Sequence, residues 1–69
     1  MTGFLMRHHG DRLAPEVQDG DVLQAVPAET AAPGALAIVM DREGVARADR
    51  DAEDVTVIGV VTDLYRRVP

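Results

Sequence analysis

The apolar residues of this sequence occur in short blocks, and glycine, proline or charged residues separate one block from the next. No window of about 11 residues carries apolar positions at the 3.6-residue spacing of an amphipathic helix. Blocks of roughly four to eight residues that are rich in β-branched side chains are typical of strands. The sequence therefore predicts a mainly β fold, with about five strands coiled into a small sheet or barrel.

Turn residues divide the chain into the expected strands. Asp41 to Gly44 have turn chemistry, so the blocks on either side of them should form a hairpin. Pro27 to Gly34 are bracketed by prolines, which favours a loop, and the stretch from His9 to Asp21 is polar and rich in turn residues. The charged run Asp49 to Asp54 favours a solvated turn. We expect strands at residues 3–8, 21–26, 35–40, 45–48 and 55–68.

The last block carries the strongest strand signal. Val57 to Val61 are almost continuously apolar, which predicts burial on both faces of a sheet, and Gly59 predicts a bulge or bend. The apolar residues of this block exceed what one edge of a small sheet needs. Because exposed strand edges pair readily, they are a candidate dimer interface, and the alternative is that they belong to the core. The residues of this interface are Val57, Ile58, Val60, Val61, Leu64 and Tyr65.

The length of 69 residues allows one domain, which we place at residues 1–69. Such a chain buries only about 60% of its unfolded surface, and it has no cysteine to form a disulfide. Phe4 and Tyr65 are its only aromatic residues, so the core must consist of Val, Leu, Ile, Met and Ala. Small domains of this kind gain stability from a partner chain, which favours a homodimer.

The composition excludes several classes of enzyme and of binding protein. The sequence contains no lysine, serine or cysteine, so the chain alone has no Ser-His, Ser-Lys, Cys-His or Schiff-base mechanism. Its net charge of −5 argues against direct binding to nucleic acid. No apolar run approaches the roughly 20 residues that span a membrane, and we expect a cytoplasmic protein.

Two adjacent histidines, His8 and His9, suggest a metal site, whereas Asp19 to Asp21 lack the ligand spacing of a calcium loop and indicate a tight turn. Neighbouring residues of a strand point to opposite faces, and two ligands do not make a site. We therefore expect ordinary surface histidines, with no metal and no cofactor.

Several motifs in the chain resemble the C-terminal peptidase domain of LexA and phage repressors, a family related in fold to signal peptidases. That family has a strand ending in Gly-Asp-Ser-Met-x-Pro, followed by a hydrophobic position and Gly-Asp. The matching residues here are Gly10, Asp11, Pro15, Val17, Gly20 and Asp21. Pro33 to Val39 resemble the family's Pro-x-Gly-Asp-x-Val-Val-Val segment, and Val55 to Val61 resemble its terminal strand. The resemblance covers almost the whole chain and implies a small coiled β-sheet of the LexA C-terminal domain type.

The catalytic positions of the family are replaced in this sequence. Arg12 stands where the family has its nucleophilic serine, and Ala46 stands where it has its general-base lysine. Arginine offers no nucleophile, and its guanidinium stays protonated in proteins. The resemblance therefore implies the scaffold without the activity, and we expect no enzyme, unless another chain supplies both the nucleophile and the base.

Two functions follow from this interpretation. The first is a catalytically inactive module that dimerises or pairs with a LexA or repressor-family protein, as the family's dimers imply, in repression or the response to DNA damage. The second is a binding module whose former active-site cleft holds a peptide or small anion at Asp11, Arg12 and Arg47. Against the second stands a plain alternative, in which Arg12 is a solvated turn residue.

Overall fold

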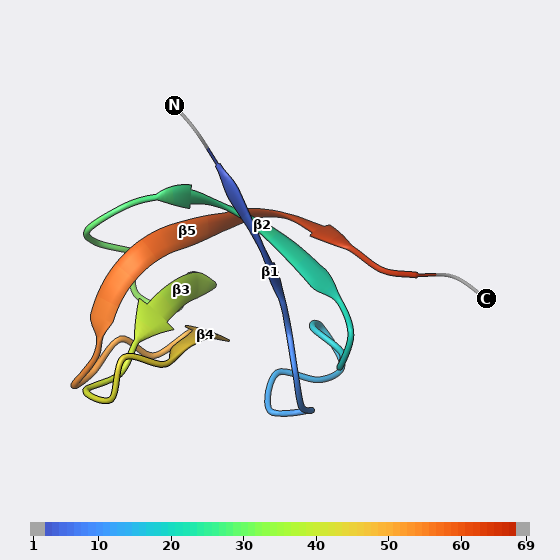
Figure 1. Cartoon of the computed structure of the whole chain (residues 1–69), viewed down its shortest axis with the longest axis horizontal. Coiled ribbons are helices and arrows are strands. Elements are labelled where there is room, and N and C mark those ends of the chain that lie inside the picture. Colours follow the sequence, from blue (N-terminus) through green and yellow to red (C-terminus); the bar gives the residue numbers. More distant parts are fainter. Residues whose placement is uncertain (1–2, 68–69) are drawn as a thin grey trace.

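The computed structural model describes residues 3–67 as an all-β protein whose five antiparallel strands form a strongly curled half-barrel sheet (Figure 1). The strands are β1 (Phe4–Arg7), β2 (Val22–Pro27), β3 (Ala37–Met40), β4 (Ala46–Asp49) and β5 (Thr56–Tyr65). Their order across the sheet is β1-β2-β5-β3-β4. The predicted β class and all five predicted strands are confirmed. The last strand ends earlier than expected, at Tyr65, and residue 68 lies outside the described residues.

Strand β5 is the centre of the sheet, and its two halves pair with different neighbours. Residues 56–60 pair with β3, and residues 59–65 pair with β2. In Figure 1, β5 forms an arch, with β3 and β4 below its first half and with β2 and β1 across its second half. The last strand in the sequence is therefore inserted between the two hairpins that precede it.

Two bulges bend β5. Val39 pairs with Val57, whereas the preceding Ile38 pairs with Gly59, which leaves Ile58 without a direct partner. On the β2 side, the register skips Thr62 in the same way. Each bulge adds right-handed twist and bends its strand. The bulge or bend predicted from Gly59 is therefore confirmed, with the extra residue at the neighbouring position.

Apolar residues on both faces of β5 are partly buried, as the continuous apolar run predicted. Ile58 and Val61 pack against the main core. Val57 and Val60 are also half-buried, and they pair with Val39 and Ala37, which are buried but lie outside that cluster. The run is apolar throughout because β5 lies at the centre of the sheet and residues on both of its faces are partly buried.

The core lies on the inner face of the half-barrel and is built from aliphatic side chains. Its buried members are Val17, Leu23, Ala25, Ile38 and Ala48. Val17 comes from the long segment between β1 and β2, and Leu13 of the same segment packs against the cluster. This polar, turn-rich segment thus also covers the core, because the open side of a curled sheet must be closed by something other than a strand.

The turn at residues 41–44 forms as predicted. The Asp41 carboxylate oxygen Oδ1 accepts hydrogen bonds from the backbone N–H groups of Glu43 (2.9 Å) and Val45 (3.0 Å). Gly44 has φ of 85°, a value that side chains other than glycine rarely adopt. This turn directs β4 back along β3, and the register is fixed by pairing of Met40 with Ala46.

Gly59 allows the aromatic ring of Phe4 to lie directly on β5. A Cβ atom added at Gly59 would lie 2.7 Å from Cζ of Phe4 and 3.0 Å from the carbonyl oxygen of Val26. Phe4 packs against the core from β1, two strands away in the sheet. The missing side chain at Gly59 is thus the space that the ring occupies.

We expect Gly59→Ala to lower the free energy of unfolding by about 1–3 kcal/mol, because the added methyl group overpacks the core. Urea denaturation of the two proteins measures this difference. The matched control is the same substitution in a Phe4→Leu background, where part of the clash is removed and the loss should be smaller. An equal loss in both backgrounds would contradict the proposed contact.

Candidate functional site

A cleft opens between the two edges of the half-barrel. Strands β1 and β4 lie at opposite ends of the strand order and do not pair with each other. The curl of the sheet brings them to opposite walls of one cleft, with a volume of about 240 Å³. Its lining residues are Met6, Arg7, His8, His9, Arg12, Val45, Ala46, Arg47 and Ala48.

The polar lining of this cleft is cationic. It holds three arginines and two histidines but no carboxylate, although the whole chain has a net charge of −5. The remaining lining residues are apolar. A concave surface lined by one sign of charge concentrates ligands of the opposite sign. The cleft therefore favours a ligand that combines an anionic group with a small apolar part.

A single carboxylate holds two of these arginines. Oδ2 of Asp49 accepts hydrogen bonds from Nη2 of Arg12 (3.1 Å) and from Nε of Arg47 (3.3 Å). Nη1 of Arg47 also lies 3.7 Å from Oδ2 of Asp41. Arg12 itself is largely exposed, so it is both a surface residue and a member of the cleft.

Asp49 is buried, and its predicted place in a solvated turn was wrong. It is the last residue of β4, whereas residues 50–54 are exposed as expected. Burial acts most strongly on the Asp49 carboxyl group and by itself would raise its pKa. Hydrogen bonds from the Asp51 amide, Arg47 and Arg12 outweigh burial, so the pKa is lowered overall. Asp49 thus remains charged inside the protein because two guanidinium groups accompany it.

The burial of His8, a polar residue of the cleft, differs from the prediction. His8 was expected at the surface, but only 7% of it is exposed. Its backbone N–H donates to the Asp21 carbonyl, and its carbonyl accepts from the Gly20 N–H, both at 2.8 Å. The buried ring atom Nε2 has no hydrogen-bond partner. The alternation that turns Phe4 and Met6 inward continues to His8, and this signal was available in the sequence.

The structure brings together most of the residues predicted for a former active-site cleft. Arg12, Arg47 and Ala46 all line the cleft. Asp11 does not line it, and its carbonyl instead accepts a hydrogen bond from the Ala14 N–H (3.1 Å). Asp11 was included in the predicted cleft because it precedes Arg12 in the sequence. In the fold, Asp11 belongs to the turn that positions Arg12.

The six residues predicted to form a dimer interface do not share one surface. Val57, Ile58, Val60 and Val61 are half-buried, and this stretch of β5 already pairs with β3, with β2, or, at residues 59–60, with both. Leu64 and Tyr65 are exposed, at 37% and 54%. Only the C-terminal end of β5 thus offers apolar surface to a partner.

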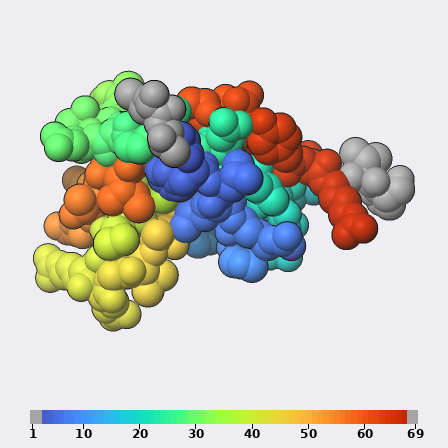
Figure 2. All heavy atoms as spheres, turned by 45° about the horizontal axis from the view of Figure 1, so that its top comes forward, coloured from blue at the N-terminus to red at the C-terminus, as the bar shows by residue number. Residues whose placement is uncertain are grey.

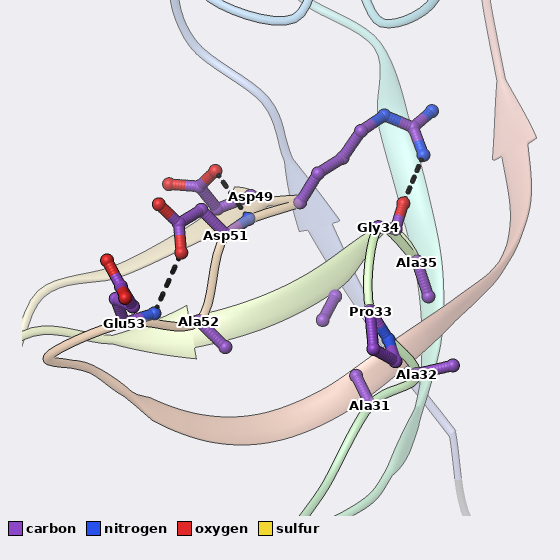
Figure 3. Close-up of a pocket in the computed structure, with 11 residues that line it drawn as sticks. Ala31, Ala32, Pro33, Gly34, Ala35, Asp49, Asp51, Ala52 and Glu53 are labelled. Atoms are coloured by element: carbon purple, nitrogen blue, oxygen red, sulfur yellow. Dashed lines mark hydrogen bonds between the residues drawn. The ribbon is translucent and has the colours of Figure 1, made fainter.

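A second hollow of about 390 Å³ lies between the loop at residues 31–35 and the turn after β4. Figure 3 shows Ala31, Ala32 and Ala35 on one side and the carboxylates of Asp49, Asp51 and Glu53 on the other. Asp49 Oδ1 accepts from the Asp51 N–H, and Asp51 Oδ1 accepts from the Glu53 N–H. Arg50 closes one end by donating to the Gly34 carbonyl (3.0 Å). The polar groups of this hollow thus stabilise the turn.

Within residues 3–67, no three His, Asp or Glu side chains are close enough together to hold a metal ion. The same part of the chain has no helix with the length and apolar character needed to cross a membrane.

An ion pair beside the cleft connects the end of β5 to the start of β2. Asp21 is buried and accepts hydrogen bonds from Nε (3.0 Å) and Nη2 (2.9 Å) of Arg66. Its Oδ2 also accepts from the Gln18 N–H (2.8 Å). The Arg66 hydrogen bonds, followed by the Gln18 amide, lower the pKa of Asp21 below its ordinary value of 3.8.

We expect this pair to contribute to acid sensitivity. Because the folded pKa of Asp21 is depressed, its stabilising effect is complete above about pH 4 and is lost as the pH falls through the folded pKa. Arg66→Ala should lower stability at pH 7 and make the decline below pH 4 shallower. Urea denaturation at pH 7, 4 and 3 measures both effects. Arg67→Ala, at the neighbouring exposed arginine, should behave as the wild type, and a parallel pH profile for Arg66→Ala would refute this role.

No protein-family model matches the chain, and no curated protein is significantly similar to it.

Proposed function

We propose that this protein is a non-catalytic relative of the LexA-type peptidase domain and acts as a binding module. The cleft between β1 and β4 is its binding site, and its ligand carries an anionic group. In this proposal the protein acts in the cytoplasm, and its role in repression or the DNA-damage response depends on what the cleft binds.

The positions of Arg12 and Ala46 support the relationship. The sequence resemblance aligned them with the nucleophile and the base of the family from two separate motifs. In the fold, these two positions line the same cleft, as the positions of a former catalytic pair should. Neither residue has a group that attacks a peptide bond or accepts a proton from a nucleophile at neutral pH. A peptidase mechanism therefore finds no support in this cleft.

The charge of the cleft is the single observation that carries the binding function. Three arginines and two histidines line it without a carboxylate, in a chain whose net charge is −5. If Arg12 were only a solvated turn residue, it would not need to contact the buried carboxylate of Asp49, which Arg47 also contacts. That convergence holds both guanidinium groups at the cleft, ready to bind an acidic group bidentately.

Titration of the ¹⁵N-labelled protein with short peptides tests this function. A glutamate-rich peptide should shift the amide signals of residues 6–12 and 45–48, whereas a lysine-rich peptide of the same length should not. Arg12→Gln and Arg47→Gln should each weaken binding about tenfold, since loss of a charged hydrogen bond costs roughly 1.5–3 kcal/mol.

Arg42→Gln is the matched control, because Arg42 is an exposed arginine of the 41–44 turn and does not line the cleft. It should bind the acidic peptide as the wild type does. Arg12→Gln and Arg47→Gln each leave the buried Asp49 with one arginine partner. Thermal melting of each variant therefore checks that the protein still folds. Equal binding of both peptides, or an equal effect of Arg42→Gln, would overturn the assignment of the cleft.

Self-association is a second candidate function, favoured by an exposed apolar surface at the other side of β1. Leu5 and Tyr65 are 66% and 54% exposed, and both line a hollow of about 370 Å³ together with Gln24. The Tyr65 hydroxyl donates to Oε1 of Gln24 (2.8 Å), which holds its ring over β2. Figure 2 shows that the red end of the described chain projects from the body of the molecule. A second copy would cover this surface and add burial that a small chain lacks.

Light scattering over a concentration series tests self-association. We expect a dimer whose melting temperature rises with concentration, and Tyr65→Asp should shift it towards the monomer. Val45→Asp, at an exposed apolar residue next to β4, should leave the dimer intact. A monomer at all concentrations would remove this candidate without affecting the cleft.

A further inference from the structure

We propose that the cleft binds the phosphate group of a small phosphomonoester, with His8, Arg12 and Arg47 as its ligands. This inference rests on the proposed binding function and names the chemistry of the ligand.

The environment of His8 supplies the first argument. Its ring is buried in the wall of the cleft, and Nε2 has no partner. Buried polar atoms in folded proteins almost always have a hydrogen-bond partner. Both backbone groups of His8 are bonded, to Asp21 and Gly20, so the chain holds the residue inward. In the tautomer that carries its proton on Nε2, a ligand oxygen in the cleft would give this nitrogen the acceptor that the protein does not provide.

The two arginines supply the second argument. A guanidinium group carries five N–H donors, and Asp49 engages only Nη2 of Arg12 and Nε of Arg47. The donors of Arg12 other than Nη2 can turn to a ligand without breaking this bond, whereas Nη1 of Arg47 also lies 3.7 Å from Oδ2 of Asp41. Asp49 and Asp41 contact two of the three arginines that line the cleft, so the lining keeps an excess of positive charge, which favours an anion. A phosphomonoester carries about −1.5 to −2 charges at pH 7.

The number of donors and the elements that carry them favour a phosphate over a carboxylate. His8 and Arg12 belong to the segment after β1, and Arg47 belongs to β4. Three oxygens of a phosphate can face donors from separate directions at once, whereas the two oxygens of a carboxylate lie in one plane. The phosphate would therefore join the two free edges of the sheet.

The rest of the lining favours an organic ester over free phosphate. Met6, Val45, Ala46 and Ala48 form the apolar part of the same cleft. Two of them are alanines, which leave room for a compact apolar substituent. We therefore expect phenyl phosphate to bind more tightly than inorganic phosphate, because the apolar wall contributes only to the ester.

Titration of the full chain with phenyl phosphate, inorganic phosphate, sulfate and acetate tests this inference by NMR. We expect phenyl phosphate to bind at least tenfold more tightly than acetate and several-fold more tightly than inorganic phosphate, and to shift the ring nitrogen signals of His8. Sulfate, which is tetrahedral and dianionic, should bind about as inorganic phosphate does. Arg12→Gln and Arg47→Gln should each weaken phenyl phosphate binding about tenfold, and Arg42→Gln should not.

His8→Phe tests the histidine directly, and it should weaken phenyl phosphate binding while keeping the volume of the ring. If this variant does not fold, the shift of the His8 ring nitrogens in the wild type decides its role. Unchanged His8 signals, or acetate binding equal to that of phenyl phosphate, would overturn the inference. If the glutamate-rich peptide binds the cleft and phenyl phosphate does not, the binding function stands and the phosphate assignment fails. If neither binds, both fail.

Discussion

The bent central strand β5 is the constraint on which the rest of this structure depends. Its two bulges, at Ile58 and Thr62, turn it so that the first half pairs with β3 and the second half with β2. A flat strand of ten residues would align all five strands in an open sheet, with its two edges far apart. The bends instead curl the sheet around a small aliphatic core. Gly59, between the bulges, leaves the space in which Phe4 packs across two strands.

The curl also gathers positive charge in one cleft of this acidic chain. It sets the free edges β1 and β4 on opposite walls of a cleft, and arginines from both sides line it. Asp49 makes this arrangement possible, because a buried carboxylate can hold Arg12 and Arg47 together while it remains charged. The unpartnered Nε2 of His8 belongs to the same wall. The cleft is thus stable without a ligand and still has donors to offer.

Local patterns were sufficient to predict the strands and turns. Short apolar blocks between turn residues marked all five strands, and Asp41 to Gly44 marked the turn that the carboxylate of Asp41 stabilises. The candidate site was predicted in part. The family resemblance brought Arg12, Ala46 and Arg47 into one cleft, but it also included Asp11, which only shapes the turn. Asp49 was assigned to a charged turn, since nothing in its neighbours along the chain indicates that the distant Arg12 would join Arg47 in pairing with its carboxylate.

The sequence by itself determined the class of fold, the turns and the absence of a serine, lysine or cysteine mechanism, because these follow from residue types and from spacing within short segments. Only the tertiary structure decided that β5 lies at the centre of the sheet, which divides its apolar residues between two faces and leaves Leu64 and Tyr65 exposed. Only the tertiary structure paired Asp49 with Arg12. Strand order and burial depend on contacts between residues far apart in the chain, and the spacing of residues within one segment does not encode them.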